Sequence, residues 1–182
     1  MKNEKSKSTQ QTTRINGARV VIKTSASGKV TVAPAAIEEW VLQAAAVRAL
    51  RGVPEYAADV EHAAAGKFTL AGDFNAARRS MREQVKAKAT GLAAGEHDLR
   101  LYIAGGRLGL IEFKAAKTPV SKDQRERHAL LAALGFAWQA VIRAETEGDA
   151  ARQAVALVRG WLAENDNQSG QGTSRCSSTA SA

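Results

Sequence analysis

The sequence predicts an α/β domain in which a mixed central β-sheet is flanked by helices. Two apolar segments flank Gly105 and Gly106 as a hairpin would, and a third apolar segment follows an intervening helical pattern. A strand, a crossover helix and a further strand favour a parallel pair, whereas the hairpin is antiparallel. One sheet would therefore contain both kinds of pairing.

The first helix is expected over residues 35–51, where Ile37, Trp40, Val41, Ala44, Val47 and Leu50 recur at helical spacing before Gly52. A second is expected over residues 75–91, with Asn75 as its N-cap and Gly91 as its stop. Two more are expected over residues 121–135 and 149–164.

Strands are expected within residues 98–115, on either side of the two glycines, and over residues 136–144. Trp40, Trp138 and Trp161 fall at apolar positions of the expected elements, so we expect all three in the core.

Both ends of the chain are polar and are expected to be disordered. Residues 1–33 are rich in Lys, Ser and Thr, although residues 18–33 have the pattern of a weak hairpin around Ser27 and Gly28. Residues 165–182 have almost nothing to bury and contain the single cysteine, Cys176. The folded domain is therefore expected over residues 34–164.

The cysteine content and the hydropathy predict a cytoplasmic protein. One cysteine forms no intrachain disulfide, which fits a reducing compartment. No stretch approaches the roughly 18 consecutive apolar residues of a membrane-spanning helix, so no membrane partner is expected.

The formal net charge of +8 is concentrated in two segments. Residues 1–30 contain seven Lys or Arg against Glu4, a net of +6. Residues 78–88 add +4, from Arg78, Arg79, Arg82, Lys86 and Lys88 against Glu83, and the remaining 141 residues sum to −2. Clustered cations gain by displacing counterions from nucleic acid, so we expect contacts to DNA phosphates; a solvated tail and helix face are the alternative.

Glu112 and Lys114 lie two residues apart in an expected strand, so they share one face. Burying such charges without partners costs several kcal/mol. Asp98 stands where the preceding strand begins, and two carboxylates with a backbone carbonyl, here that of Phe113, can hold Mg²⁺. Lys114 would then assist the attacking water, which is the chemistry of phosphodiester hydrolysis.

The hairpin turn decides whether these groups meet. A two-residue turn at Gly105 and Gly106 would place Leu99 opposite Glu112 and turn Asp98 to the other face. A three-residue loop, residues 104–106, or a bulge would pair Asp98 with Glu112. We therefore predict that the turn is not the two-residue kind.

The segment "GEHDLRLYIAGGRLGLIEFKAAKTPVSKDQRERHALLAALG" resembles the core of a VRR-NUC domain, a branch of the PD-(D/E)XK nuclease superfamily. The resemblance extends from about Glu38 to Leu162 and implies a restriction-endonuclease-like fold with a mixed sheet. It also implies a Mg²⁺-dependent nuclease in which Mn²⁺ substitutes. The implied motif residues are Asp98, Glu112 and Lys114, supported by Gln124 and by Glu39 or Glu38.

Stand-alone phage and bacterial members of this family are dimeric cutters of branched DNA, which implies a homodimer acting on four-way junctions or flaps in repair or recombination. One residue departs from the family pattern, since His97 replaces the proline before the first aspartate. Two other functions stay open: a catalytically inactive DNA-binding module of the same fold, and an interaction protein that uses its basic tail.

Two of these residues also have simpler interpretations. Gln124 follows Ser121 at the spacing of a capping box, in which the glutamine bonds back to the start of the helix. His97 is interpreted as a loop residue before it is considered as a ligand or a base.

Overall fold

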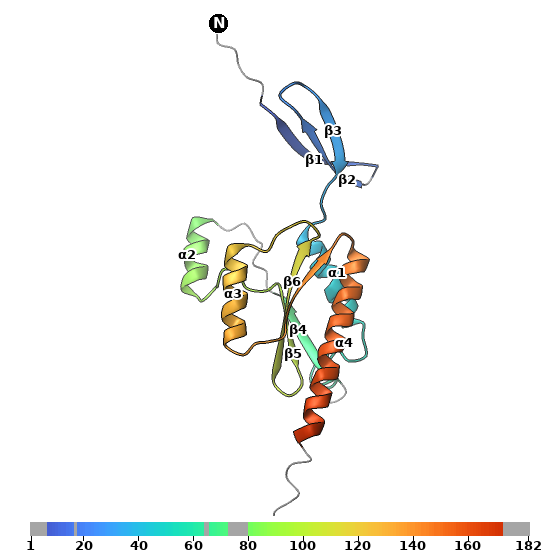
Figure 1. Cartoon of the computed structure of the whole chain (residues 1–182), viewed down its shortest axis with the longest axis vertical. Helices are drawn as coiled ribbons and strands as arrows, with labels where there is room; N and C mark the ends of the chain where they lie inside the picture. Colours follow the sequence, from blue (N-terminus) through green and yellow to red (C-terminus); the bar gives the residue numbers. More distant parts are fainter. Residues whose placement is uncertain (1–6, 17, 64–65, 73–79, 173–182) are drawn as a thin grey trace, which may run out of the picture. The chain divides into compact units, whose positions relative to one another are not determined.

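A computed structural model describes residues 7–16, 18–63, 66–72 and 80–172. The chain divides between Ile37 and Glu38 into two compact units, and each is considered separately (Figure 1).

The N-terminal unit is a three-stranded antiparallel sheet in the order β1-β2-β3. Its strands are β1 (Thr9–Ile15), β2 (Ala18–Thr24) and β3 (Val30–Pro34). The hairpin expected around Ser27 and Gly28 is confirmed, with Gly28 at φ +81° in the turn. These three strands lie within the segment that was expected to be disordered, and β1 adds the third strand that stabilises a marginal hairpin.

The second unit contains a four-stranded sheet in the order β4-β5-β6-β7. Its strands are β4 (Phe68–Gly72), β5 (Leu99–Ile103), β6 (Arg107–Ala115) and β7 (Gln139–Ala144). Only the β6–β7 pair is parallel, so the expected mixed sheet is confirmed. The edge strand β4 was not predicted, because its five residues "FTLAG" are too short to show a clear period.

The helices of this unit are α1 (Glu39–Arg51), α2 (Met81–Ala89), α3 (Lys122–Ala133) and α4 (Glu147–Gly172). Helix α1 begins four residues later than predicted, because Glu38 has the extended backbone of an N-cap. Helix α4 continues beyond residue 164, so disorder is wrong for residues 165–172. The predicted N-cap Asn75 and Cys176 lie outside the described residues.

Helix α2 is capped by Ser80 and Glu83. The Glu83 amide donates to Ser80 Oγ, and Glu83 Oε2 accepts from the Ser80 amide at 2.7 Å. Gly91, the predicted stop, lies two residues beyond the helix at φ +91°.

Helices cover both faces of β6. The odd-numbered face, with Ile111 and Phe113, is fully buried and lies toward α1 and α4. Gly109 on this face allows α4 to approach, since a Cβ there would lie 2.6 Å from Trp161 Cζ3. Glu112, on the even-numbered face, is contacted by α3.

Trp161 is buried, as expected of a core residue, and stacks at 6.0 Å on Trp138, which is only half-buried. Trp40 is 57% exposed, which corrects its expected core position. Its indole instead donates to Glu38 Oε2 at 2.6 Å. Within the described ranges, no helix is long and apolar enough to cross a membrane.

Candidate active site

The register of the β5–β6 hairpin brings two carboxylates to one face. Leu99 pairs with Ile111 and Ile103 pairs with Arg107, which leaves a three-residue loop at residues 104–106. Gly105 and Gly106 both have positive φ in this loop, so the predicted turn is confirmed. Extending the register by one residue places Asp98 opposite Glu112.

Asp98 directly precedes β5, and its side chain continues the hydrogen bonding between the two strands of the hairpin. Its Oδ2 accepts a hydrogen bond from the Phe113 amide at 2.7 Å, and its own carbonyl accepts one from Gln43 Nε2 at 2.7 Å. Because the N–H and C=O of one strand residue point to the same side, the Phe113 carbonyl also faces the Asp98 side of the strand. Asp98 is therefore held from both α1 and β6.

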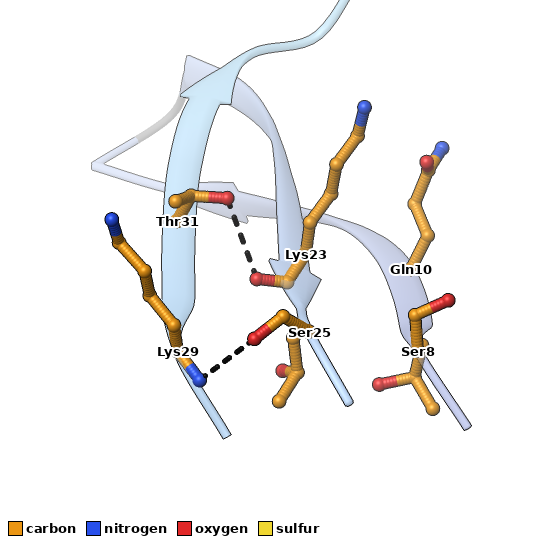
Figure 2. A pocket seen from close by; sticks show the side chains of 8 residues that line it. Ser8, Gln10, Lys23, Ser25, Lys29 and Thr31 are labelled. Atoms are coloured by element: carbon orange, nitrogen blue, oxygen red, sulfur yellow. Dashed lines mark hydrogen bonds between the residues drawn. The ribbon is translucent and has the colours of Figure 1, made fainter. Parts of the chain in front are cut away.

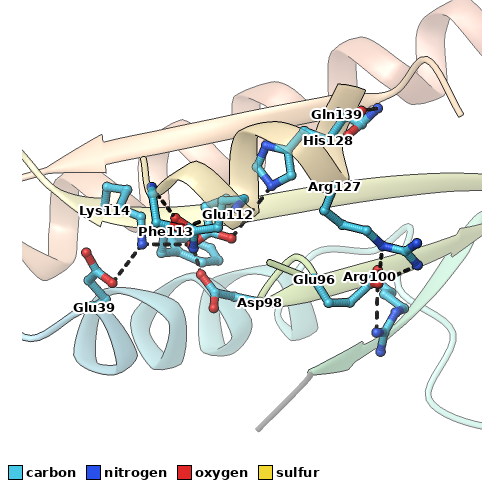
Figure 3. A network of polar contacts seen from close by, with 12 residues as sticks. Glu39, Glu96, Asp98, Arg100, Glu112, Phe113, Lys114, Arg127, His128 and Gln139 are labelled. Carbon is cyan, nitrogen blue, oxygen red and sulfur yellow. Dashed lines mark hydrogen bonds and ion pairs between the residues drawn. The ribbon is translucent and has the colours of Figure 1, made fainter. Parts of the chain in front are cut away.

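Lys114 joins two glutamates from different elements (Figure 3). Its Nζ lies 2.8 Å from Glu112 Oε1 and 2.9 Å from Glu39 Oε2. The side chains of Glu112 and Lys114 are 1% and 6% exposed, whereas that of Glu39 is 36% exposed. The buried pair thus reaches solvent on the Glu39 side.

The side chain of Gln124 both caps α3 and contacts Glu112. Its Oε1 accepts from the Ser121 amide at 2.9 Å while its own amide donates to Ser121 Oγ, completing a capping box. The other end of the same side chain, Nε2, donates to Glu112 Oε1 at 2.5 Å. The start of α3 and the orientation of Glu112 are therefore coupled.

Two histidines complete the surroundings of Glu112. His97 is fully buried and stacks on His128 with ring centroids 3.8 Å apart. His128 Nε2 lies 4.0 Å from Glu112 Oε2, and neither atom has a hydrogen-bond partner among the described residues. His97 is thus a loop residue, as the sequence suggested, and its ring is in addition buried and packed.

An ion pair at the edge of the site fixes the hairpin to α3. Arg127 Nε donates to Glu96 Oε2 at 2.9 Å, and Arg100 lies 3.7 Å from the other oxygen of Glu96 (Figure 3). Glu96 is only 10% exposed, so this contact holds the segment leading into Asp98 against the helix.

Burial is the main cause of the altered protonation of the carboxyl groups. It raises the pKa of Glu112 to about 7, against the effect of the Lys114 hydrogen bond, and the negative charge of Asp98 adds to the rise. Burial likewise raises the pKa of Asp98. Burial lowers the pKa of Lys114, but hydrogen bonds to Glu112 and Glu39 outweigh it and the net pKa is raised. Lys114 therefore stays charged.

The structure brings together Glu39, Asp98, Glu112, Lys114 and Gln124, all expected from the sequence. Between the two glutamates that were left open, Glu39 contacts Lys114, whereas Glu38 contacts Trp40.

The structure describes the side chains of two of the five expected DNA-contacting residues. Arg82 and Lys86 are exposed on α2. Arg78, Arg79 and the side chain of Lys88 lie outside what the structure describes.

Sequence reasoning missed Gln43 and His128. Each stands four residues after a predicted site residue on the same helix, Gln43 after Glu39 and His128 after Gln124. Residues four apart share a helix face, so this spacing was the available signal.

The two carboxylates also allow a test of whether the site fits a divalent cation. In the described part of the chain, no three or more His, Cys, Asp or Glu side chains form a preassembled metal cluster. Glu112 Oε2 and Glu39 Oε1 are nevertheless buried oxygens without a hydrogen-bond partner. Since Mg²⁺ is bound by few protein oxygens and keeps several waters, Asp98, Glu112 and the Phe113 carbonyl fit such an ion.

Comparison of the chain with protein-family models, with curated proteins and with solved structures found no match.

Proposed function

We propose that this protein is a metal-dependent endonuclease that hydrolyses DNA phosphodiester bonds on a restriction-endonuclease-like core of the VRR-NUC type. The observation that supports this most directly is Glu112. Its carboxylate is buried beside Asp98, one oxygen is held by Lys114 and Gln124, and the other has no hydrogen-bond partner among the described residues. Buried carboxylates with raised pKa values are more frequent at functional sites than in structural cores.

Asp98, Glu112 and the Phe113 carbonyl would hold Mg²⁺, or Mn²⁺ in its place. When bound, the ion polarises the phosphate and lowers the pKa of a water molecule. Gln124 keeps Glu112 Oε1 in a fixed position, and the Phe113 amide does the same for Asp98 Oδ2. These contacts keep the carboxylates in place before the substrate arrives.

Lys114 acts as a charged hydrogen-bond donor in this proposal. Its raised pKa means that it keeps its proton at neutral pH, so it does not serve as the base. Its ammonium orients the attacking water and stabilises the negative charge that grows on the phosphate oxygens during attack. Glu39 holds that ammonium from the partly exposed side of the site.

The substrate side of the proposal is branched DNA, cut by a homodimer in the cytoplasm. Arg82 and Lys86 are exposed on α2, and the neighbouring sequence supplies Arg78, Arg79 and Lys88. Contacts of this kind go to phosphates, so they position DNA without reading its sequence.

A DNA-binding module without catalytic activity is the second candidate, because one observation favours it. His97 replaces the family's proline, and its ring packs on His128 directly beside Glu112. An imidazole pair in this place fills space next to the carboxylate that would hold the ion.

The test uses labelled duplex, single-stranded, flap and four-way-junction DNA with Mg²⁺, Mn²⁺ or EDTA. The proposal expects metal-dependent cleavage that is lost in Lys114→Ala and kept in Lys67→Ala, a matched variant that removes an exposed lysine paired with Asp166. Binding without cleavage, equal in all three proteins, would instead identify the inactive module.

A further inference from the structure

The N-terminal sheet contains a polar pocket that the proposed chemistry does not use (Figure 2). Two lysines line it together with hydroxyl and amide side chains and no carboxylate: Ser8, Thr9, Gln10, Lys23, Thr24, Ser25, Lys29 and Thr31. Every lining group can donate a hydrogen bond to an anion, so the pocket has the chemistry of a phosphate site.

Strand register builds this pocket. Lys23 pairs with Gln10 on one side and with Thr31 on the other, so the three side chains form one row across the sheet. Lys29 is placed by the turn, where its amide donates to Ser25 Oγ at 3.0 Å and its carbonyl accepts from the Ser25 amide at 2.9 Å. The backbone beneath both lysines is therefore fixed.

The same face of the sheet continues to be basic beyond the pocket. Alternation along β1 and β2 places Arg14 and Arg19 on the face of Lys23, and the register sets these two arginines directly opposite each other.

No acidic side chain in this segment competes for the lysines. From Lys5 to Ile37 the sequence contains six Lys or Arg and no Asp or Glu. Lys23 and Lys29 are exposed, and neither ammonium forms an ion pair with a described residue. The whole unit, residues 1–37, contains one further lysine and Glu4 and has a formal net charge of +6, which attracts polyanions.

The composition of the segment also narrows the kind of partner. Residues 7–37 contain no Phe, Tyr, Trp or His, so the sheet offers no aromatic ring on which a base could stack. Hydroxyl, amide and ammonium donors contact phosphate and sugar instead. Binding by this face would follow the backbone and be independent of sequence.

We propose that the N-terminal sheet is a second DNA-binding surface, which holds backbone phosphates at the pocket of Lys23 and Lys29 and along the basic face. The choice of DNA as the polyanion rests on the proposed nuclease function. The surface anchors the chain to DNA separately from the candidate active site.

The experiment measures the binding of full-length protein to labelled duplex DNA in EDTA, by fluorescence anisotropy over a range of salt concentrations. Lys23→Gln/Lys29→Gln removes two charges from the pocket. Arg48→Gln/Arg152→Gln removes two charges from exposed ion pairs with Glu147 and Asp149, and so matches the change in net charge. Thermal melting of each variant confirms that it is folded.

The proposal expects the pocket variant to bind about tenfold more weakly and its salt slope to fall by about 1.8, since each phosphate contact adds about 0.9. The control should change by less than about twofold. Unchanged affinity and slope in the pocket variant would overturn the proposal. The proposal would also be overturned if the pocket variant lost binding to poly-glutamate and still bound DNA like the wild type. The pocket would then be a site for an acidic protein chain.

The cleavage assay separates this inference from the proposed function. If the wild type cleaves no DNA and the pocket variant binds DNA more weakly than the wild type, the second surface is supported and the nuclease function is contradicted. Cleavage by the wild type together with unchanged binding by the pocket variant would contradict only the second surface.

Discussion

The rings of His97 and His128 stack 3.8 Å apart with an interplanar angle of 17°. Burial, with smaller effects from the charges of His128, Arg100 and Arg127, lowers the pKa of His97 to about 3. Burial also lowers the pKa of His128. Both rings are therefore neutral at pH 7, and a neutral imidazole pair packs beside the buried carboxyl of Glu112.

Replacing His97 by phenylalanine should make the protein less sensitive to acid. In the unfolded chain His97 takes a proton below about pH 6.5, whereas in the native state it stays neutral down to about pH 3. The wild type therefore loses free energy of unfolding as the pH falls through this window, on the order of 2 kcal/mol by pH 5 from this residue alone.

The measurement is urea unfolding of wild type and His97→Phe at several pH values. Phenylalanine keeps the stack and loses none of the described hydrogen bonds, because neither nitrogen of His97 has a hydrogen-bond partner in the part of the chain that the structure describes. Any packing strain adds an offset that does not vary with pH. Parallel curves for the two proteins between pH 7 and 4 would contradict the buried neutral histidine.

Lys114→Met should be destabilising by about 3 to 5 kcal/mol, because it leaves Glu112 buried without its charged partner. Lys114→Met/Glu112→Gln should recover a large part of that loss, since both charges are then removed together. Denaturant titration of the two single variants and the double variant gives the coupling energy. If the loss of unfolding free energy in the double variant equalled the sum of the losses in the two single variants, Glu112 and Lys114 would not be paired in solution.

The two roles of Gln124 can be separated by comparing it with Ser121. Ser121→Ala removes the helix cap and should cost about 1 kcal/mol of stability. It should leave DNA cleavage close to that of the wild type. Gln124→Ala should cost a similar amount of stability and in addition reduce cleavage by about tenfold or more, because Glu112 loses a fixed hydrogen-bond donor. Equal cleavage by both variants would limit Gln124 to capping.

Mg²⁺ should stabilise the protein more at pH 8 than at pH 6. Burial raises the pKa of Glu112 from 4.5 to about 7, so the native state without metal binds a proton on this carboxyl more tightly than the unfolded chain does. The contribution of Glu112 to the free energy of unfolding therefore falls as the pH rises from about 4.5 to about 7. A cation binds the ionised form, so its effect grows over the same range.

Thermal melting with and without Mg²⁺ at the two pH values measures this effect. Glu112→Gln should abolish the increase, whereas Glu147→Gln, an exposed glutamate on α4, should keep it. A Mg²⁺ effect of the same size at both pH values would argue against Glu112 as a ligand.

Much of the site could be predicted because its residues lie close together in the sequence. The loop at Gly105 and Gly106 sets the register by local geometry, and this alone places Asp98 opposite Glu112. Glu39 was reached only through family resemblance, because no local rule relates the first turn of a helix to a strand 75 residues later.

The residues that were missed depend on packing between elements. His97 and His128 are 31 positions apart, and only the folded contact of the hairpin with α3 brings their rings together. The strand β1 was missed for a similar reason, since its threonines and glutamines do not alternate with apolar residues and its pairing with β2 decides its conformation.

The double use of Gln124 affects how mutations would accumulate in descendants of this protein. Under the proposed nuclease function, a descendant that no longer cleaved DNA would still lose stability on replacing Gln124, because the beginning of α3 depends on it. Lys114 differs from Gln124 in this respect. Once a neutral residue replaces Glu112, the buried ammonium of Lys114 loses one of its charged partners and becomes destabilising. In descendant sequences that have lost the activity, we therefore expect Glu112 and Lys114 to change together first, while Gln124 is kept.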